Sequence, residues 1–246
     1  MTRFFIPTTQ IKENQVFLIG EDQHHLVKVL RKKPGDRIAV LNGKGEEYDV
    51  EIKEINSEFV VGQILGTTCK SSEPKVKITL VQSLPKSDKF DWIIQKNTEL
   101  GVSRFIPVIS ERSTIKLDQA TAIKKVERWR KIIQTAAEQS GRGITPELTA
   151  VWSWKQLLAE LPKTLVVIPW EGEQESSLKL ILKSQPDPAP EVTVLIGPEG
   201  GFSLKEIAAA KEQGAQPVTL GPRIFRTETA GLVAATAILY HFDDLG

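Results

Sequence analysis

Two glycine-rich stretches near the end of the chain carry the residues best suited to chemistry. The first is Ile196-Gly-Pro-Glu-Gly-Gly-Phe-Ser203 and the second is Leu220-Gly-Pro-Arg-Ile-Phe-Arg-Thr-Glu-Thr-Ala230. Each follows an apolar run that predicts a buried strand, Val192–Ile196 and Pro217–Leu220, and each precedes a predicted helix. Glycines in such loops let a ligand approach the backbone closely. Because ligands bind at the carboxyl ends of strands in open α/β sheets, we expect both stretches to line one pocket.

Few side chains in these stretches suit nucleophilic catalysis. The sequence has no G-x-G-x-x-G dinucleotide motif, no G-x-x-x-x-G-K-[ST] phosphate loop and no G-x-S-x-G nucleophile motif. Of its three histidines, His24 and His25 are adjacent and His241 lies near the end, so no pair has the helical spacing of a metal site. This inventory predicts a site that holds a cofactor through backbone groups and leaves the chemistry to that cofactor.

Composition restricts the class of protein. The 246 residues are 40% hydrophobic and 26% charged, as in ordinary globular domains. No apolar run approaches the roughly 18 residues of a membrane span, and the start lacks a signal-peptide pattern. A single cysteine, Cys69, excludes an intramolecular disulfide and a cysteine-based zinc cluster, so we expect a cytoplasmic protein without a metal. The net charge of +1 means that any nucleic acid must bind through local basic patches.

The chain predicts two domains. Residues 1–70 predict a small, mostly β domain with strands at Phe4–Ile6, Val16–Ile19, Arg37–Leu41, Tyr48–Ile55 and Phe59–Leu65. A helical segment is expected at Glu21–Leu30 and a hairpin turn at Asn42–Gly45. The polar connector Lys70–Lys75 then leads to residues 76–246, where strands alternate with helices and predict a mostly parallel sheet covered on both faces.

Two segments are locally basic. Lys28, Arg31 and Lys32 follow one another closely in the first domain. The stretch from Arg112 to Arg142 contains eight basic residues and three acidic ones. It includes a helix that is expected from Asp118 to Ser140. Solvated surface is one interpretation of each segment, and contact with nucleic-acid phosphates is the other.

The last predicted helix, about Glu228 to Phe242, is apolar on nearly all sides. Such a helix is expected to be buried, in its own subunit or against a second copy of the chain.

The two glycine-rich stretches together closely resemble the signature of the ribosomal RNA small subunit methyltransferase E family, within the SPOUT class of knotted methyltransferases. The segments Val29–Arg31, Gln95–Val102, Ser110–Arg112 and Ala136–Arg142 also resemble that family, in the same order along nearly the whole chain. Phe202 and Phe225 stand where aliphatic residues are common in the family, a departure that removes no polar group.

The resemblance implies the fold, donor and partners. It implies an α/β protein with an N-terminal PUA-like small β-barrel that binds RNA, and a SPOUT domain with a C-terminal trefoil knot. It implies a homodimer that uses S-adenosyl-L-methionine to methylate N3 of a uridine in 16S ribosomal RNA, with the assembled 30S subunit as the expected substrate. The cofactor-binding residues that it implies are Ile168, Pro169, Ile196, Gly197, Pro198, Glu199, Gly200, Gly201, Leu220, Gly221, Ile224, Phe225, Arg226, Thr227, Thr229 and Ala230.

Uridine N3 must lose a proton before or during methyl transfer, so a base or an anion-stabilising group is needed. Arg226 and Arg223 are the candidates for binding the target base or its phosphate, and Glu228 and Glu199 are the candidates for a base. For both carboxylates the alternative is a capping role at a helix start. The residues expected to contact RNA elsewhere are Arg3, Lys28, Arg31, Lys32, Arg112, Arg128 and Arg142.

Two other functions remain open from the sequence. A non-catalytic RNA-binding factor for ribosome assembly would use the basic segments alone and would have no affinity for the methyl donor. An enzyme of the same fold would instead modify another RNA or a ribose hydroxyl.

Overall fold

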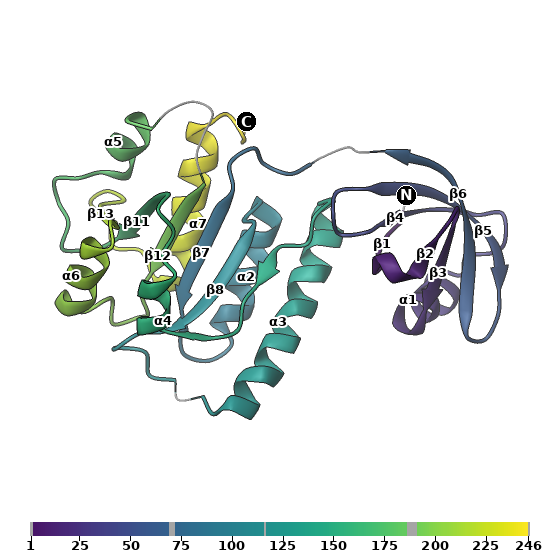
Figure 1. Ribbon diagram of the computed structural model, residues 1–246, viewed down its shortest axis with the longest axis horizontal. Helices are drawn as coiled ribbons and strands as arrows, with labels where there is room; N and C mark the ends of the chain where they lie inside the picture. Colours follow the sequence, from purple (N-terminus) through teal and green to yellow (C-terminus); the bar gives the residue numbers. More distant parts are fainter. Residues whose placement is uncertain (1, 69–71, 116, 186–190, 246) are drawn as a thin grey trace. The chain divides into compact units, whose positions relative to one another are not determined.

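The chain forms two compact units in a computed structural model that describes residues 2–68, 72–115, 117–185 and 191–245. The first unit comprises Met1–Glu73 and Ala137–Thr145, and the second comprises Pro74–Ala136 and Pro146–Gly246 (Figure 1). The predicted boundary within Lys70–Lys75 lies partly outside the described residues. The segment 137–145 shows that the first unit is built from two separate stretches of sequence.

A six-stranded sheet forms the first unit, with strand order β1-β4-β5-β6-β3-β2. Its strands are β1 Arg3–Phe5, β2 Ile11–Lys12, β3 Gln15–Ile19, β4 Arg37–Leu41, β5 Glu47–Ile55 and β6 Phe59–Thr68, with a 3-10 turn η1 at Thr8–Gln10. Only β1 and β4 pair in parallel among these strands. Alternate residues point inward, because a strand presents successive side chains to opposite faces. Val16, Leu18, Val50 and Ile52 are thus fully buried in one core.

The helical segment expected at Glu21–Leu30 is formed by two consecutive helical stretches of different type. Helix α1 covers Gly20–His24 and continues into a π-helical turn, η2, over His25–Val29. Leu26 is fully buried, and the ring of His25 packs edge-on against Phe4. Arg31 follows with a φ of 53°, in the left-handed region that a residue with a Cβ rarely adopts. The wide turn therefore buries Leu26 and leaves Lys28 and Arg31 exposed.

The second unit contains a parallel sheet of seven strands. Strands β10, β8, β7, β12, β11 and β13 lie in this order, and β9 pairs with β8. Their bounds are β7 Ile78–Ser83, β8 Arg104–Ile109, β9 Glu147–Leu148, β10 Trp152–Ser153, β11 Leu165–Pro169, β12 Val192–Ile196 and β13 Gln216–Val218. All pairs in this sheet are parallel. The loops that follow β11, β12 and β13 therefore leave the sheet at the same edge.

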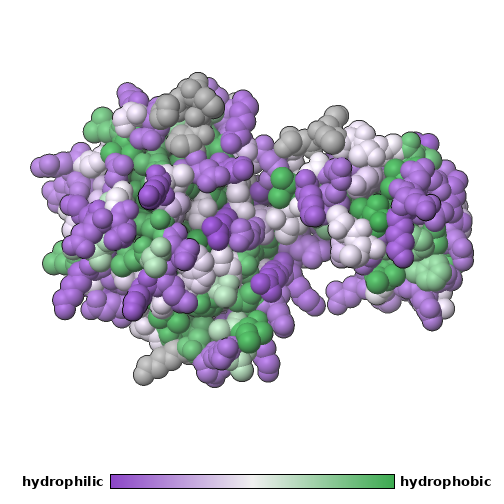
Figure 2. All heavy atoms as spheres, viewed as in Figure 1, coloured by the Kyte–Doolittle hydropathy of each residue, from purple (hydrophilic) through white to green (hydrophobic). Residues whose placement is uncertain are grey.

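Helices cover both faces of this sheet, as the alternation of strands and helices predicted (Figure 1). Leu80 and Val194 pack on one face with α2 Lys89–Leu100, α3 Gln119–Ser140, α5 Leu178–Lys183 and α7 Thr227–His241. Val81 and Leu195 pack on the other face with α4 Trp154–Ala159 and α6 Leu204–Glu212. On the face shown in Figure 2, hydrophilic residues cover most of the surface of both units.

The spacing of Ile123, Val126, Ile133 and Ala137 predicts the buried stripe of α3, and the structure differs from it at one position. Val126 and Ile133 are buried as their helical spacing predicted, but Ile123 is 54% exposed. Trp129 takes the buried place instead, where its ring packs on Phe90 and its Nε1 donates to Asp91 at 3.0 Å. The indole fills the space between α2 and α3, so the stripe depends on one large side chain that the aliphatic pattern did not reveal.

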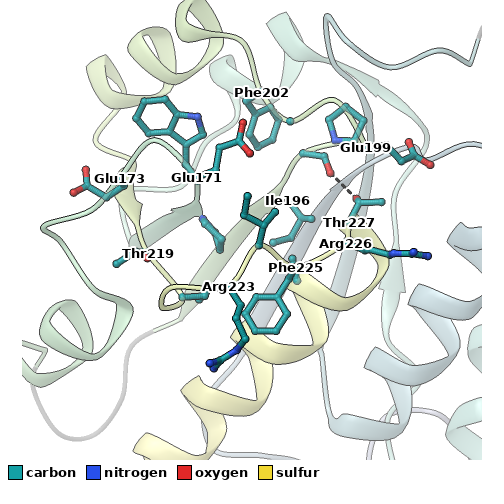
Figure 3. A pocket seen from close by; sticks show the side chains of 18 of the residues that line it. Glu171, Glu173, Ile196, Glu199, Phe202, Thr219, Arg223, Phe225, Arg226 and Thr227 are labelled. Carbon is teal, nitrogen blue, oxygen red and sulfur yellow. Dashed lines mark hydrogen bonds between the residues drawn. The ribbon is translucent and has the colours of Figure 1, made fainter.

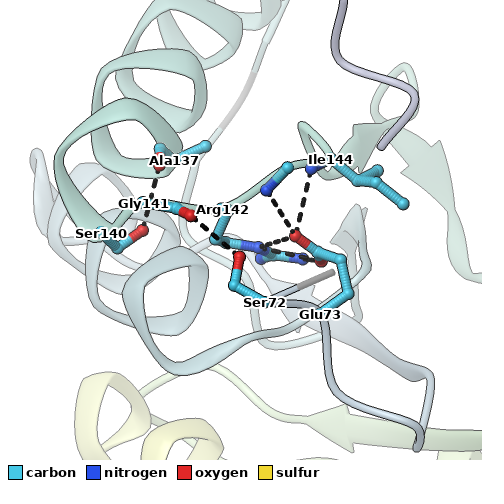
Figure 4. Close-up of polar contacts among 8 residues, drawn as sticks. Ser72, Glu73, Ala137, Ser140, Gly141, Arg142 and Ile144 are labelled. Carbon is cyan, nitrogen blue, oxygen red and sulfur yellow. Dashed lines mark hydrogen bonds and ion pairs between the residues drawn. The ribbon is translucent and has the colours of Figure 1, made fainter. Parts of the chain in front are cut away.

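A buried ion pair joins the two stretches of the first unit (Figure 4). The guanidinium of Arg142, 4% exposed, donates to the carboxylate of Glu73, with Nη2 and Oε2 2.5 Å apart. The same carboxylate accepts from the amides of Gly143 and Ile144, each at 3.1 Å, and the Ser72 hydroxyl donates to the Gly141 carbonyl at 2.8 Å. A buried charge is tolerated when it is paired and its remaining hydrogen-bonding capacity is satisfied.

We expect Glu73→Ala to destabilise the first unit by about 3–5 kcal/mol, because it leaves the Arg142 guanidinium buried without its partner. Hydrogen exchange of peptides from residues 2–68, followed through a urea titration, measures this loss. Glu58→Ala is the matched control, because Glu58 is exposed and its side chain has no hydrogen bond or ion pair among the described residues. An unchanged midpoint for Glu73→Ala would contradict the role of the pair.

Asp22, on α1, gives the first unit a pH-dependent stability. Burial raises the pKa of Asp22 to about 6, helped by the nearby carboxylates of Glu138 and Glu21 and opposed by His25. The folded unit therefore binds this proton more tightly than the unfolded chain, and its stability should fall as the pH rises from about 4 to about 6.

We expect Asp22→Asn to raise the free energy of unfolding by about 1 kcal/mol at pH 7 and to change it little at pH 4. A pKa difference of one unit represents about 1.36 kcal/mol of stability. The expected gain is smaller than the full difference would give, because Asp22 is only half-buried and solvent screens its charge. Urea titrations of both proteins at the two pH values measure the difference. A variant that is equally stabilised at pH 4 would show that the effect does not come from the charge.

Candidate functional site

A cavity of about 950 Å³ lies in the second unit where β11, β12 and β13 end (Figure 3). It is lined by the loop after β11, both glycine-rich stretches, the first turn of α7 and Lys89 of α2. The sheet creates this position, since parallel strands deliver three loops to one edge. The predicted pocket is thus a real cavity in the structure.

The hydroxyl of Thr227 joins three elements at the base of the site. It donates to the Gly197 carbonyl at 2.6 Å and accepts a hydrogen bond from Nε2 of Gln82 at 2.9 Å. Gln82 lies at the end of β7 and is 1% exposed, and its Nε2 also donates to the Ser83 carbonyl. The start of α7 is therefore fixed to the ends of both β7 and β12. The sequence analysis missed Gln82, although an amide inside an otherwise apolar strand was a signal that could have revealed it.

The loop after β12 is held in place by its own backbone and by residues after β8. A Cβ at Gly197 would lie 3.1 Å from Gly201 and Phe202, so a side chain there would push the loop backbone apart by a few tenths of an ångström. Nη1 of Arg112 donates to the Gly200 carbonyl at 2.8 Å. Glu206 accepts from the Glu111 amide at 2.7 Å, so the helix that follows the loop is also tied to the end of β8.

The loop before α7 exposes two cations. Gly221 has a φ of 108° and no atom within 4 Å of the position where a Cβ would stand, so it leaves open space beside the backbone. Arg223 and Arg226 line the cavity and are exposed, and their side chains point in different directions in Figure 3. Neither guanidinium has an ion pair or hydrogen bond with any described residue. Ile224 between them is 81% exposed.

Two carboxylates and one ammonium group meet at the α2 side of the cavity. Nζ of Lys89 lies 3.4 Å from Oε1 of Glu199 and 3.4 Å from Oε2 of Glu228. Partial burial opposes ionisation of Glu199, but hydrogen bonds from the amides of Glu199 and Lys86, together with the Lys89 ammonium, outweigh it and lower the pKa of that carboxyl. Glu199 is thus held as an anion that accepts from the Lys86 amide at 3.0 Å.

Sequence reasoning also missed Lys89. Its position is unusual, because a lysine in the first turn of a helix is disfavoured by the helix dipole. That mismatch between residue and position was the available signal.

Most residues expected to bind the cofactor line the cavity. The lining residues among them are Pro169, Ile196, Gly197, Pro198, Glu199, Gly201, Leu220, Gly221, Ile224, Phe225, Arg226, Thr227 and Ala230. The candidates for catalysis, Arg223, Arg226 and Glu228, line it too. Three expected residues do not: Ile168 is fully buried in the core, and Gly200 and Thr229 lie beside the lining residues of their segments.

The residues expected to contact RNA are divided between the two units. Lys28 and Arg31 are exposed in the first unit, where Arg3 lies 3.5 Å from Glu47. In the second unit Arg128 pairs with Asp91 and with Asp88 at 3.6 Å, yet remains 54% exposed.

Arg142 is a correction to the sequence analysis. Its guanidinium is buried and occupied by Glu73, so it stabilises the fold and is not available to an RNA phosphate.

Within the described ranges, no group of three or more histidine, cysteine, aspartate and glutamate side chains is placed to hold a metal ion. No helix in the same ranges is long and apolar enough to span a membrane.

Family models match both parts of the chain. Residues 72–239 match an RNA methyltransferase domain, and residues 18–65 match an RNA methyltransferase PUA domain. The α/β fold thus combines a PUA domain with a methyltransferase domain built on a parallel sheet.

Individual relatives match over nearly full length. The ribosomal RNA small subunit methyltransferase E of Bacillus subtilis is 40% identical, with 98% of this chain and 96% of the relative covered. The solved structure of the protein of that name from Neisseria gonorrhoeae, bound to S-adenosyl methionine, is 32% identical with a TM-score of 0.86, covering 98% of this chain and 97% of that one. A methyltransferase of Legionella pneumophila, solved with bound SAM, is 31% identical with a TM-score of 0.86, covering 98% of each chain.

The two glycine-rich loops, the parallel sheet that places them and these matches agree, and the chain belongs to the ribosomal RNA small subunit methyltransferase E family.

Proposed function

We propose that this protein transfers a methyl group from S-adenosyl-L-methionine to N3 of a uridine in small-subunit ribosomal RNA. The observation that carries this proposal is the cavity itself, which combines backbone walls from two glycine-rich loops with two arginines that pair with no described residue. Family membership supplies the reaction class, and relatives solved with the donor bound support its identity.

The residues present fit a bound donor of this kind. Ile196, Leu220 and Phe225 supply apolar lining for a planar base, while the open space at Gly201 and Gly221 lets polar groups approach the backbone. When bound, the donor supplies a methyl group on a positively charged sulfur, which leaves as a neutral thioether. The acidic side chains of Glu171 and Glu199 in the lining suit a cation.

The arginines are the proposed contacts to the RNA. Arg223 and Arg226 are exposed and line the cavity, which supports a role for these side chains in binding the RNA phosphates or the target base. Further contacts are proposed for Arg3, Lys28, Arg31, Lys32, Arg112 and Arg128. Because these residues belong to both units, we expect them to contact a large folded RNA, such as that of the assembled 30S subunit. This substrate would be met in the cytoplasm.

The proposed chemistry requires removal of the proton at uridine N3. Glu228 is the better candidate for the base, because Glu199 already accepts from the α2 start and its pKa is lowered. Arg226 would stabilise the negative charge that develops on the uracil ring as the proton leaves. The apolar lining excludes water from the reacting atoms.

We further propose that α7 forms part of a homodimer interface. The helix is buried at Gly231, Ala234, Ala235 and Ile238, but it is not covered on all sides within one chain. Ala237 is exposed, and Tyr240 is 71% exposed. Trp92, 42% exposed, lies on α2, which packs along α7. A second copy would cover this apolar face, and sedimentation of the chain measures this directly.

The finer architecture is also a proposal. A domain boundary at 70–76, closure of the first sheet into a barrel and a trefoil knot at the end of the chain all follow from the family resemblance. Support for the knot comes from the start of α7, which is bonded to the ends of two adjacent strands through Thr227.

The function is tested with a strain that lacks this gene. We expect one uridine of its 16S RNA to lose an N3-methyl group, detected by mass mapping, and we expect the purified protein with the methyl donor to restore it on isolated 30S subunits. Loss of a methyl group from a transfer RNA or a ribose hydroxyl would redirect the proposal to another RNA. A protein without affinity for the donor would favour the assembly factor.

Arg226→Ala should abolish methyl transfer while leaving donor affinity within about threefold of wild type, because the side chain acts on the RNA. Removal of one charge-stabilising donor costs about 10²–10³ in rate. Calorimetry measures the affinity and incorporation of labelled methyl measures the rate. Lys163→Ala is the control, since Lys163 is exposed and does not line the cavity. Lost donor binding, or full activity, would refute this assignment.

A further inference from the structure

Among the residues that the structure describes, Lys89 is the one lysine in the lining of the cavity. It is the first residue of α2, and its side chain is 38% exposed. Its ammonium group lies 3.4 Å from a carboxylate oxygen of Glu199 and 3.4 Å from one of Glu228. These carboxylates come from different elements, the loop after β12 and the first turn of α7. One cation therefore links both glycine-rich stretches to α2.

The two carboxylates differ in how firmly they are held. Glu199 also accepts from the Lys86 amide at 3.0 Å, so it is fixed to the backbone before α2. Lys89 provides the hydrogen bond and the ion pair of the Glu228 carboxylate, and no other described residue supplies one. The contacts form a chain from the Lys86 amide through Glu199 and Lys89 to Glu228. Of the two carboxylates, only that of Glu228 depends on the ammonium group for all of its hydrogen bonds and ion pairs with described residues.

Without a cation, this arrangement would be unfavourable. Both oxygens contact the same nitrogen, so the carboxylates lie close together, and two like charges in a partly buried site repel. Loss of the ammonium would free the Glu228 side chain to turn away from Glu199. A carboxylate that accepts a proton must be held within hydrogen-bond reach of it, and small displacements reduce the rate strongly.

We propose that Lys89 is a positioning residue that holds the Glu228 carboxylate, anchored through Glu199, where it accepts the N3 proton of the target uracil. In that step the N3–H bond breaks, the proton passes to a Glu228 oxygen, and the electron pair stays on N3 for bond formation with the methyl carbon. This inference rests on the proposed function and adds a residue to it. It also explains why a lysine occupies a helix start, where the dipole disfavours it.

The test uses four variants of the full chain: Lys89→Met, Lys89→Arg, Glu228→Gln and the double variant Lys89→Met with Glu228→Gln. Lys89→Met keeps the length of the side chain and removes the charge. We expect it to lower kcat by about 100-fold, the lower end of what a positioned base contributes, with donor affinity within about twofold of wild type. Lys89→Arg, which restores the cation, should recover kcat to within about tenfold of wild type.

The double variant decides between a positioning role and an independent one. If Lys89 acts through Glu228, the double variant should be no more than about threefold slower than Glu228→Gln alone, because the loss of the base has already removed what Lys89 supports. If the two losses multiply instead, Lys89 acts on the RNA or on the fold and the inference is wrong. Lys96→Met is the matched control on α2, since Lys96 pairs with Glu99 at 2.8 Å and does not line the cavity.

A crystal structure of Lys89→Met without the donor gives a readout that does not depend on activity. We expect the Glu228 carboxylate to be displaced while the backbone of α7 is unchanged, and an unmoved carboxylate would overturn the inference. If Lys89→Met does not fold, Glu199→Ala replaces it, because it removes the carboxylate that anchors Lys89 and should displace the same Glu228 carboxylate.

The two hypotheses fail separately. A wild-type protein that transfers no methyl group to ribosomal RNA would refute the proposed function. An active wild type with full kcat in Lys89→Met would refute only the role of Lys89.

Discussion

The geometry of the cavity depends on the hydroxyl group of Thr227. This one group donates to the carbonyl of Gly197 and accepts from the amide of Gln82, so it fixes the start of α7 against the ends of β12 and β7. A threonine is suited to this because its hydroxyl both donates and accepts. The donor and acceptor lie in a buried region, where an unmade hydrogen bond is costly. These hydrogen bonds therefore fix the position of the first turn of α7 relative to the loop after β12.

The charged groups around the cavity are organised by that constraint. Arg226 and Glu228 flank Thr227 in sequence, so fixing Thr227 also limits where their side chains can lie. Glu228 lies within 3.4 Å of the Lys89 ammonium, whereas Arg226 remains exposed. The same short segment therefore presents a carboxylate bound to the protein and a guanidinium free for a ligand. A reaction that removes a proton and stabilises the resulting negative charge needs both kinds of group.

Elsewhere in the chain, the polar contacts of arginine side chains join segments that are far apart in the sequence. For the eight basic residues between Arg112 and Arg142, the sequence left two interpretations open, a solvated surface and contact with nucleic-acid phosphates. In the structure Arg142 is buried on Glu73, Arg128 pairs with Asp91, and Arg112 bonds to the Gly200 carbonyl. An excess of charge counted along the sequence does not reveal which cations are paired, because their partners come from distant segments. Arg223 and Arg226, which stood in no basic run, line the cavity without an ion pair or hydrogen bond to any residue that the structure describes.

The sequence by itself determined the elements and the composition of the two loops. Period-two and apolar runs predicted β3, β4 and β12 closely, because burial of alternate or successive residues is a local property of a strand. A glycine after a helical pattern is typical of a helix end, and Gly101, with a φ of 117°, follows α2 in this way. The resemblance to a known family then predicted most residues that line the cavity.

The tertiary structure alone decided the contacts between those elements. The π-helical turn around Leu26, the buried Trp129 in place of Ile123, and the roles of Gln82, Lys89 and Glu73 all depend on residues far apart in sequence. Such contacts arise only when the parallel sheet brings the ends of β7 and β12 together and sets α2 beside α7. The physical reason is that hydrogen bonds, ion pairs and burial depend on distances in space. A pattern of residue types along the chain carries no information about those distances.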